Sequence, residues 1–580
     1  MNSTGIQPAR SRALIFALLV FPYFLNLGVS ALWDSNEAFY AETPREMLER
    51  RDFIFPTFNH EPRVHKPPLT YWLIALSYRL FGISEFSARI PSALAVCLLL
   101  GFLIYFLLRN NAQVIAATAS SLEVAQRPAE RWARLPADDH AWAAAILAAS
   151  FLATTPRFFI SARRLAIDCL LTVFVTISLL LVYWALHAEQ SETIPAGRWR
   201  PSFERWMAAG LFAGLAFLTK GPIALVLLAI TTVLFCWQQK KLPRSGLWFF
   251  FAAFLLISVP YYLVLWKRSS LAVLYNFFFT ENIGRYTVVT FSPWRGPLYY
   301  LRVLLADAFP WSWFLPVAFY LRKFWAPSRN ALVHFCWIWF LVVVLFFSLS
   351  HTKEEYYILP AYPALAILIA HFFVGLKVEK AASKVLWATA LCIGLGLVIA
   401  GLFFLWASKF LPLAVIGWWI SGLLALGAAG TLVLFWRGAP SAAAGLLIML
   451  LLLTMATINA AILPALETLR PTRPLTAEIA RSMQPADHAG YFRLASPSMS
   501  FYLRQHISEL FHLEDLEADL DKPGRSWLLM EAEQFQALPS SLQNRLEVID
   551  SAAEFPTAGK RLWKIRSSTD LPLVLLVRER

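Results

Sequence analysis

The chain has 580 residues, of which 58% are hydrophobic and 15% charged, with a mean hydropathy of +0.55 and a net charge of +14. Soluble domains are roughly a quarter charged, so this composition excludes an ordinary soluble enzyme, a disordered protein and a coiled coil. It indicates a polytopic membrane protein. The positive charge lies in residues 1–465, because residues 466–580 hold 14 Lys and Arg against 16 Asp and Glu. A basic membrane region suits anionic headgroups or an anionic substrate, and no soluble basic module for nucleic acid is present.

Long apolar runs predict thirteen membrane-spanning helices. They are 12–32, 88–108, 141–160, 165–187, 206–219, 221–238, 246–266, 297–320, 331–349, 357–375, 384–407, 412–436 and 441–465. The first run follows Arg10 and Arg12 and is longer than the apolar core of a signal peptide, so we expect a retained anchor. Segment 67–82 is short, contains Arg79 and is rich in aromatic residues, so we interpret it as a helix in the membrane interface.

Lys and Arg gather in alternate short loops, which places those loops and the N-terminus in the cytoplasm by the positive-inside rule. Counting 67–82 as a span would invert every later loop. The two loops too long to be simple connectors, 33–87 and 267–296, then lie outside. Residues 1–465 are expected to form the membrane domain and residues 466–580 an exocytoplasmic domain.

Short apolar runs in residues 466–580 predict a small α/β fold for this domain. Strands are expected near Ser526–Met530 and Leu571–Val577, and helical pieces near 533–549. The domain has no site signature of its own, so a capping or docking role is the simplest expectation.

Carboxylates next to the outer ends of spans are candidate catalytic groups. Asp34 and Glu37 follow the first span, and Asp168 opens the fourth. Such a carboxylate can act as a general base or a metal ligand, and helix capping is the structural alternative. A charge at membrane depth needs a partner, so we expect Arg163 or Arg164 to pair with Asp168.

Four cations in the outer segments are expected to converge: Lys66, Lys220, Arg285 and Lys353. A gathered set of cations suits a phosphate that leaves with negative charge. Snorkelling of these side chains to lipid headgroups is the alternative interpretation. His65, next to Lys66, is either a solvated loop residue or a metal ligand.

Several of these residues belong to motifs that follow one another in a fixed order. The motifs are Asn36-Glu37-Ala-Phe-Tyr-Ala-Glu42-Thr-Pro-Arg45-Glu46-Met, Lys66-Pro-Pro-Leu-Thr-Tyr71-Trp, Thr219-Lys220-Gly-Pro, Glu281-Asn282-Ile-Gly-Arg285, and Lys353 through Pro360. The ordered set, over residues 12 to about 370, resembles the aminoarabinose transferase branch of the protein mannosyltransferase-like GT-C glycosyltransferases. This resemblance implies the GT-C fold, with about thirteen transmembrane helices and an outer C-terminal domain.

The resemblance also implies a function. An enzyme of this kind takes a sugar from a polyprenyl phosphate donor, usually undecaprenyl phosphate in bacteria. It passes the sugar to lipid A, or to another envelope glycan or protein, on the outer face of the inner membrane. A transporter or flippase of lipid-linked sugars, and a polymerase or ligase of glycans on the same carrier, remain alternatives. We expect a monomer.

The implied roles fall on the residues already singled out. Lys66, Lys220, Arg285 and Lys353 would hold the donor phosphate. Glu37, aided by Asp34, would orient or deprotonate the acceptor, and Asp168 would shape the sugar pocket. The residues expected to contact substrate are Asn36, Tyr40, Tyr71, Glu281 and Tyr357.

One position departs from the family pattern. The first outer loop of the family usually carries an Asp-Glu pair, and here the first position is Asn36, which cannot act as a general base. An acceptor that is already a phosphate anion needs no strong base, whereas a hydroxyl acceptor would need Glu37 or Asp34. Some relatives bind a divalent metal near this loop, and the candidate ligands here are His65, Glu37 and Asn282.

Overall fold

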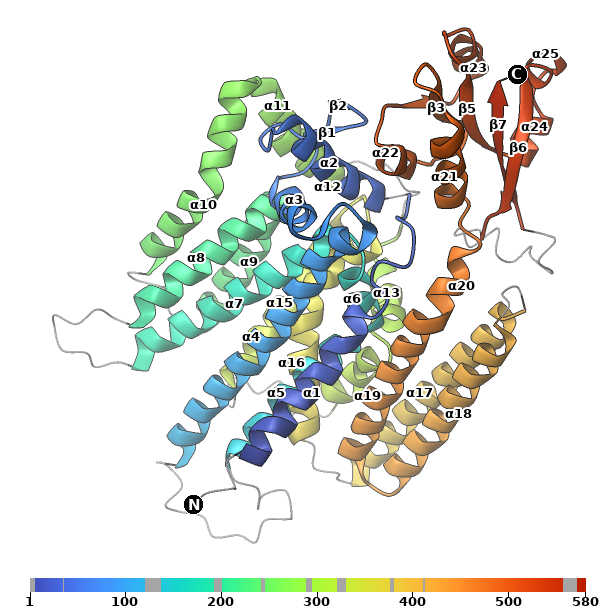
Figure 1. Cartoon of the computed structure of the whole chain (residues 1–580). Coiled ribbons are helices and arrows are strands. Elements are labelled where there is room, and N and C mark those ends of the chain that lie inside the picture. Colours follow the sequence, from blue (N-terminus) through green and yellow to red (C-terminus); the bar gives the residue numbers. More distant parts are fainter. Residues whose placement is uncertain are drawn as a thin grey trace.

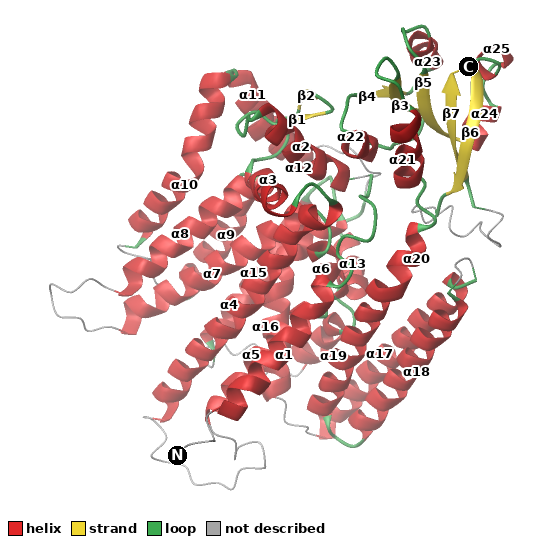
Figure 2. Ribbon diagram, in the orientation of Figure 1, coloured by secondary structure: helices red, strands yellow, loops and turns green. Residues whose placement is uncertain are grey.

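Helices dominate the computed structural model (Figure 2), which describes residues 6–34, 36–119, 137–191, 201–240, 246–287, 295–320, 330–375, 380–409, 413–555 and 571–579. The helices of the bundle are α1 (Ile6–Phe24), α4 (Glu85–Ala119), α5 (Ala137–Ala153), α6 (Pro156–Ala162), α7 (Ile167–Ser191), α8 (Pro201–Lys220), α9 (Ile223–Gln238), α10 (Leu247–Arg268), α13 (Tyr299–Asp307), α14 (Leu315–Tyr320), α15 (Ala331–Leu349), α16 (Tyr362–Gly375), α17 (Lys380–Ala407), α18 (Ala414–Trp436), α19 (Pro440–Thr457) and α20 (Leu463–Glu467). Short 3₁₀ segments, Trp311–Phe314 and Glu355–Ala361, and a π-helical segment, Ile458–Ile462, connect some of them.

Within the described residues, eight helices are long and apolar enough to cross a membrane, and the bent pair α5 and α6 would make a ninth. Two shorter apolar helices lie at Arg12–Phe24 and Ile223–Gln238. The predicted number of thirteen spans therefore stays a prediction. The run 297–320, predicted as one helix, is divided at Pro310 into α13, a 3₁₀ turn and α14, because proline has no N–H for a helical hydrogen bond.

Helix α7 is the centre of the bundle. Of the apolar 18-residue stretch of α7, 94% is buried inside the protein. The corresponding share is 28% for α10 and 33% for both α17 and α18. Helices α17 and α18 form a hairpin at the edge of the bundle (Figure 1). Among the candidate membrane spans that the structure describes, α7 is the most enclosed, and Asp168 lies at its head.

The long outer segments fold at the end of the bundle opposite the N-terminus (Figure 1). They comprise α2 (Glu37–Arg50), the hairpin of β1 (Thr57–Phe58) and β2 (Glu61–Pro62), α3 (Leu69–Phe81), α11 (Leu271–Tyr275), the π-helical segment Asn276–Gly284 and α12 (Arg285–Thr287). Helix α3 is seen along its axis in Figure 1 and lies across the direction of the bundle helices. This orientation agrees with the interpretation of 67–82 as an interfacial helix.

The C-terminal residues form a five-stranded sheet with the strand order β4-β3-β5-β7-β6. Its elements are α21 (Thr472–Ser482), β3 (His488–Phe492), α22 (Ser498–Leu503), β4 (Ile507–Leu510), α23 (Leu513–Leu520), β5 (Ser526–Glu531), α24 (Ala532–Gln536), α25 (Ser540–Gln543), β6 (Leu546–Ala553) and β7 (Leu573–Glu579). Strands β3, β4 and β5 are parallel, and β7 runs antiparallel to β5 and β6. The two predicted strands are confirmed as β5 and β7, but residues 546–549, predicted as helical, belong to β6.

Two arginines fasten the outer end of the first helix to the bundle. Arg163 donates hydrogen bonds to the carbonyl oxygens of Pro22 and Tyr23, each at 2.8 Å. Arg89, which is 2% exposed, donates to the carbonyl oxygens of Leu27 and other residues that follow α1. Carbonyl groups at the end of a helix lack backbone partners, so these guanidinium groups satisfy them and fix the segment that leads to Glu37.

Candidate active site

A polar cavity of about 150 Å³ lies where the outer segments meet the heads of the central helices. Its walls come from the start of α2, the turn between α6 and α7, the end of α8 and the segment before α16. The lining residues are Trp33, Asn36, Glu37, Tyr40, Lys66, Arg157, Ile160, Ser161, Arg164, Leu165, Ala166, Ile167, Asp168, Lys220, Tyr356 and Tyr357. Cations and carboxylates therefore share one enclosed space at the end of an apolar bundle.

An ion pair between Asp168 and Lys220 lies in the cavity wall. The ammonium of Lys220 donates a hydrogen bond to Oδ1 of Asp168, and it lies 4.4 Å from the centre of the Tyr357 ring. The helix ends directly after Lys220 because Gly221 adopts a positive φ of 78°. The expectation that Arg163 or Arg164 pairs with Asp168 is wrong: Arg163 is used by the carbonyl groups of α1, and Lys220 is the partner.

Glu37 is the most constrained carboxylate of the cavity. Its Oε1 accepts hydrogen bonds from Arg89 Nε at 3.1 Å and from the Leu165 backbone N–H at 2.9 Å. Its Oε2 accepts from Arg89 Nη2 at 2.7 Å and from the Trp33 N–H at 3.0 Å. Burial alone would raise the pKa of this carboxyl, but the charge and hydrogen bonds of Arg89 outweigh burial, and the pKa lies below its usual value. Glu37 is therefore ionised and fully hydrogen-bonded.

Two further arginines line the cavity. Arg157 donates from Nε to Asp307 Oδ2 at 2.7 Å. The guanidinium carbon of Arg164 lies 4.1 Å from the centre of the Trp33 ring. Burial, together with the neighbouring charge of Arg89, lowers the pKa of Arg164, although the Glu37 carboxylate opposes this shift.

Lys66 reaches the cavity from the loop before α3. Its ammonium lies 3.8 Å from Glu281 Oε2, and Nδ1 of the adjacent His65 lies 3.1 Å from Glu281 Oε1. The loop that carries Glu281 thus meets the loop of Lys66, as the predicted convergence of outer segments requires. Glu281 itself contacts these two residues and is not part of the cavity wall.

The candidate metal ligands do not gather around one point. Among the residues that the structure describes, no three His, Cys, Asp or Glu side chains are arranged to hold a metal ion. His65 and Glu281 supply one adjacent pair of donors. Asn282 donates its amide to the Phe277 carbonyl at 2.7 Å, and both oxygens of Glu37 are engaged by other groups. The described donor set therefore does not fit a metal centre built from His65, Glu37 and Asn282.

Several predicted residues lie outside the cavity wall. Asp34 accepts a hydrogen bond from the Ser498 N–H at 2.8 Å and so faces α22, and burial raises its pKa despite that bond. Lys353 is buried, and its ammonium donates to the Ser350 carbonyl. Tyr71 is fully buried against Tyr40, with ring centres 5.9 Å apart. The side chain of Arg285 is not among those that the structure describes.

Sequence reasoning missed part of the cavity wall. Trp33, Arg157 and Tyr356 were not predicted, whereas Arg163 or Arg164 was expected both as a partner of Asp168 and as a member of the outer set of cations near the donor phosphate. Arg157 and Arg164 lie in a predicted outer turn, whereas the positive-inside rule places Arg in cytoplasmic loops. This exception was the signal in the sequence that could have indicated a functional role for both residues.

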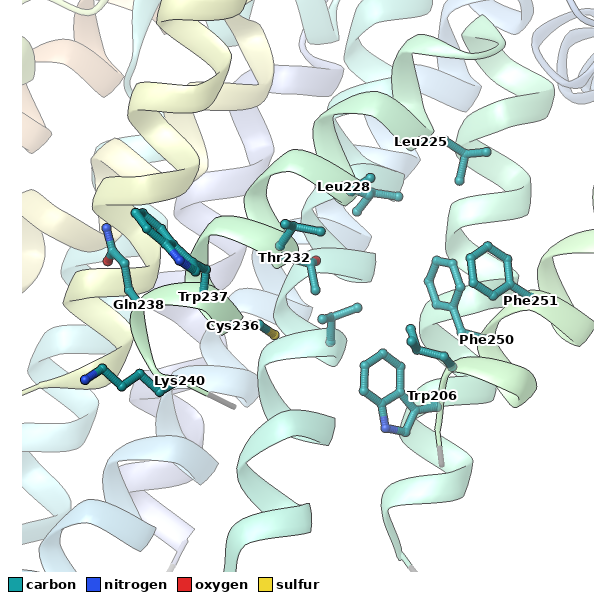
Figure 3. Close-up of a pocket in the computed structure, with 14 residues that line it drawn as sticks. Trp206, Leu225, Leu228, Thr232, Cys236, Trp237, Gln238, Lys240, Phe250 and Phe251 are labelled. Carbon is teal, nitrogen blue, oxygen red and sulfur yellow. The ribbon is translucent and has the colours of Figure 1, made fainter. Parts of the chain in front are cut away.

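An apolar groove of about 1030 Å³ runs along α9 between α8 and α10. Figure 3 shows Leu225, Leu228 and Thr232 along one side of this groove and Trp206, Phe250 and Phe251 on the other. The groove extends from Leu225, five residues after Lys220, to Lys240, which lies two residues beyond the end of α9. Its walls are almost wholly apolar, which suits a hydrocarbon chain. Lys66 lines the polar cavity and not this groove.

The chain resembles known membrane glycosyltransferases. A family model described as dolichyl-phosphate-mannose-protein mannosyltransferase matches residues 65–136 and 140–266. The undecaprenyl phosphate-alpha-4-amino-4-deoxy-L-arabinose arabinosyl transferase of Pseudomonas aeruginosa (strain UCBPP-PA14) is 32% identical over 428 residues, 71% of this chain and 70% of that protein. A second transferase of this description, from Pseudomonas fluorescens (strain Pf0-1), is 30% identical over 62% of this chain and 58% of its own length.

A solved structure resembles nearly the whole chain. It is ArnT from Cupriavidus metallidurans bound to undecaprenyl phosphate, which is 20% identical, with a TM-score of 0.72 over 99% of this chain and 98% of that one. The fold is therefore that of the GT-C membrane glycosyltransferases. Within that class, the chain belongs to the family of undecaprenyl phosphate-4-amino-4-deoxy-L-arabinose arabinosyl transferases. It spans 58% of the P. fluorescens relative, less than two thirds of that protein.

Proposed function

We propose that this protein transfers an amino sugar such as 4-amino-4-deoxy-L-arabinose from undecaprenyl phosphate to a phosphate group of lipid A. Another envelope glycan or a protein is the alternative acceptor. The reaction takes place on the periplasmic face of the bacterial inner membrane, in the cavity around Asp168 and Lys220. The observation that carries this proposal is the cavity itself. It lies at the outer end of the bundle and is lined by four cationic side chains: Lys66, Lys220, Arg157 and Arg164.

The charges of the cavity suit this transfer. An acceptor phosphate oxygen attacks the anomeric carbon, a new C–O bond forms, and the bond from that carbon to the carrier phosphate breaks. The electron pair of the broken bond stays on the carrier phosphate, where Lys66 and Lys220 stabilise the developing charge. Asp168 fixes the ammonium of Lys220 through their hydrogen bond.

The state of Glu37 favours an anionic acceptor over a hydroxyl. A general base needs a free lone pair directed at the proton that it removes. The oxygens of Glu37 already accept four hydrogen bonds from Arg89, Trp33 and Leu165. A phosphate acceptor is ionised before it reacts and loses no proton in the transfer, so Glu37 serves as an organiser of the cavity wall.

The apolar groove beside α9 suits the isoprenoid chain of the donor. It lies between α8, which ends in Lys220, and α10, and it is long enough to follow much of α9 (Figure 3). Each buried CH₂ group stabilises binding by about 0.8 kcal/mol, so a long apolar chain gains most of its affinity in such a groove.

Narrowing the groove tests this placement. Thr232→Trp is expected to raise KM about tenfold for a donor on the undecaprenyl carrier, because the half-buried Thr232 lies midway along the groove. A donor on a ten-carbon carrier should show an unchanged KM. Leu426→Trp, at a 74% exposed position of α18, is the matched control. Equal KM values for the long-chain donor in both variants would place the isoprenoid chain elsewhere.

Loss of the gene tests the proposed function. Mass spectrometry should then show lipid A without its amino sugar and an accumulation of the undecaprenyl-linked sugar. Unchanged lipid A together with altered envelope glycoproteins would assign the alternative acceptor. Accumulation of the carrier-linked sugar only on the cytoplasmic leaflet would instead indicate a flippase.

A further inference from the structure

The ring of Trp33 lies between two guanidinium groups from distant parts of the chain. The guanidinium carbon of Arg164 is 4.1 Å from the ring centre, and that of Arg470 is 4.2 Å from it. Arg164 follows α6, whereas Arg470 lies between α20 and the C-terminal sheet. Planar guanidinium groups stack favourably on indole rings, so the three side chains form a stack that fixes the position of each.

Arg470 is fastened to the segment that leads into α2. It donates a hydrogen bond to the Ala31 carbonyl at 2.8 Å, and Glu467 accepts one from the Ala31 N–H at 2.8 Å. Arg473 donates to the Val29 carbonyl at 3.2 Å. The base of the C-terminal unit thus holds residues 29–31 through both donors and acceptors, and it reaches the cavity wall through Trp33.

Asn59 and Asp34 also connect the first outer loop to the C-terminal unit. The Asn59 side chain accepts a hydrogen bond from the Ile507 N–H and donates one to the Ile507 carbonyl, both at 2.8 Å. It thereby pairs with the backbone of β4, which is an edge strand of the sheet. Asp34 accepts from the Ser498 N–H of α22. The first outer loop and the C-terminal sheet therefore form one continuous structure.

Arg164 brings positive charge to the cavity wall without a carboxylate of its own. Arg157 is paired with Asp307, and Lys220 is paired with Asp168. Glu37 is the carboxylate whose charge acts on Arg164. Its two oxygens already accept hydrogen bonds from two nitrogens of Arg89. Among the described residues, no side-chain hydrogen bond from Arg164 to a carboxylate is found. Arg164 therefore adds a positive charge to this wall that no carboxylate neutralises through a direct hydrogen bond.

We propose that Arg164 binds a phosphate monoester in the cavity and that Arg470, acting through Trp33, is the residue that positions it. The phosphate belongs either to the acceptor or to the carrier, since both present the same chemistry. This inference rests on the proposed function for the identity of the two ligands, and it gives the C-terminal unit a part in substrate binding.

Binding measurements on the full-length protein in nanodiscs test this inference without requiring turnover. The probes are diphosphoryl lipid A, its dephosphorylated form and undecaprenyl phosphate. Arg164→Ala and Arg470→Ala are each expected to weaken the binding of one phosphorylated probe about tenfold, with dephosphorylated lipid A unaffected. Arg470→Lys should weaken it less than Arg470→Ala, because it retains the charge but loses the planar stack. The probe that loses affinity identifies the source of the phosphate.

Arg481→Ala is the control, because Arg481 is a 77% exposed arginine of the same C-terminal unit. Unchanged binding of both phosphorylated probes to Arg164→Ala, or an equal loss for the dephosphorylated lipid, would overturn the inference. If Arg164→Ala binds both phosphorylated probes normally while the wild-type protein still transfers the sugar, the phosphate site is rejected and the proposed function is retained. Absence of transfer by the wild-type protein, combined with the expected binding losses, would reject the proposed function and keep the phosphate site.

Discussion

Asp168→Asn is expected to lower kcat/KM for sugar transfer by about 10²- to 10³-fold, the usual loss when a preorganised electrostatic group is removed. The substitution keeps the shape of the side chain but removes the charge that holds the Lys220 ammonium in the cavity wall. Initial rates of transfer by purified protein in proteoliposomes would measure the effect.

A double variant separates this role from a role in folding. Asp168→Asn leaves a buried ammonium without its counter-charge and should destabilise the protein, whereas Asp168→Asn combined with Lys220→Met removes both charges and should recover stability. Activity should remain low in both. Asp521→Asn, which removes an exposed ion pair with Arg545 in the C-terminal unit, should leave the rate within about twofold of the wild type. Recovered activity in the double variant would show that transfer needs neither the Asp168 carboxylate nor the Lys220 ammonium.

Glu37→Gln is expected to destabilise the folded protein by about 3 kcal/mol. It leaves the buried guanidinium of Arg89 without the carboxylate that it contacts through two nitrogens. Thermal unfolding of the detergent-purified protein would measure the loss. Glu49→Gln is the matched control, because Glu49 is 51% exposed and its pair with Arg45 should contribute less than about 1 kcal/mol.

The same carboxyl gives the stability a pH dependence. The pKa of Glu37 is lowered in the folded protein from its usual value of 4.5, so its contribution is complete above that value. The contribution is lost as the pH falls through the lowered pKa. The stability difference between wild type and Glu37→Gln should therefore be constant from about pH 6 to 8 and shrink only under strongly acidic conditions. A difference that shrinks near neutral pH would contradict the ionised state of Glu37.

Much of the cavity could be predicted from the sequence because its residues stand out locally. Lys66, Asp168 and Lys220 are charged residues at the ends of apolar runs. A charge at membrane depth is energetically costly and therefore indicates a partner or a functional site. The structure places all three in one cavity wall with Asn36, Glu37, Tyr40 and Tyr357. Their roles in transfer remain predictions that the variants above test.

The pairings within the cavity could not be predicted, because they depend on contacts between segments far apart in the chain. Arg164 stands four residues before Asp168, and that spacing suggested a pair, yet Lys220 of another helix is the partner. Arg89 lies inside a predicted span, and nothing local indicates that it binds Glu37. The stack of Arg470 on Trp33 joins the segment before α2 to the segment after α20.

Hydropathy predicted most helices, and it failed where backbone chemistry intervened. The run 297–320 is apolar throughout, but Pro310 divides it. The run 141–160 is likewise apolar, but the chain bends by 69° between α5 and α6, where Pro156 begins the second helix. Hydropathy counts apolar residues and is insensitive to these interruptions.

The most direct test of the account is transfer by the purified protein in proteoliposomes that contain lipid A and undecaprenyl phosphate-linked 4-amino-4-deoxy-L-arabinose. The account predicts that mass spectrometry will detect lipid A carrying the sugar on a phosphate, formed by the wild-type protein and reduced at least a hundredfold in Asp168→Asn. Modified lipid A formed equally by both proteins would contradict the assigned cavity. No transfer to lipid A by a protein that binds the donor would contradict the proposed acceptor.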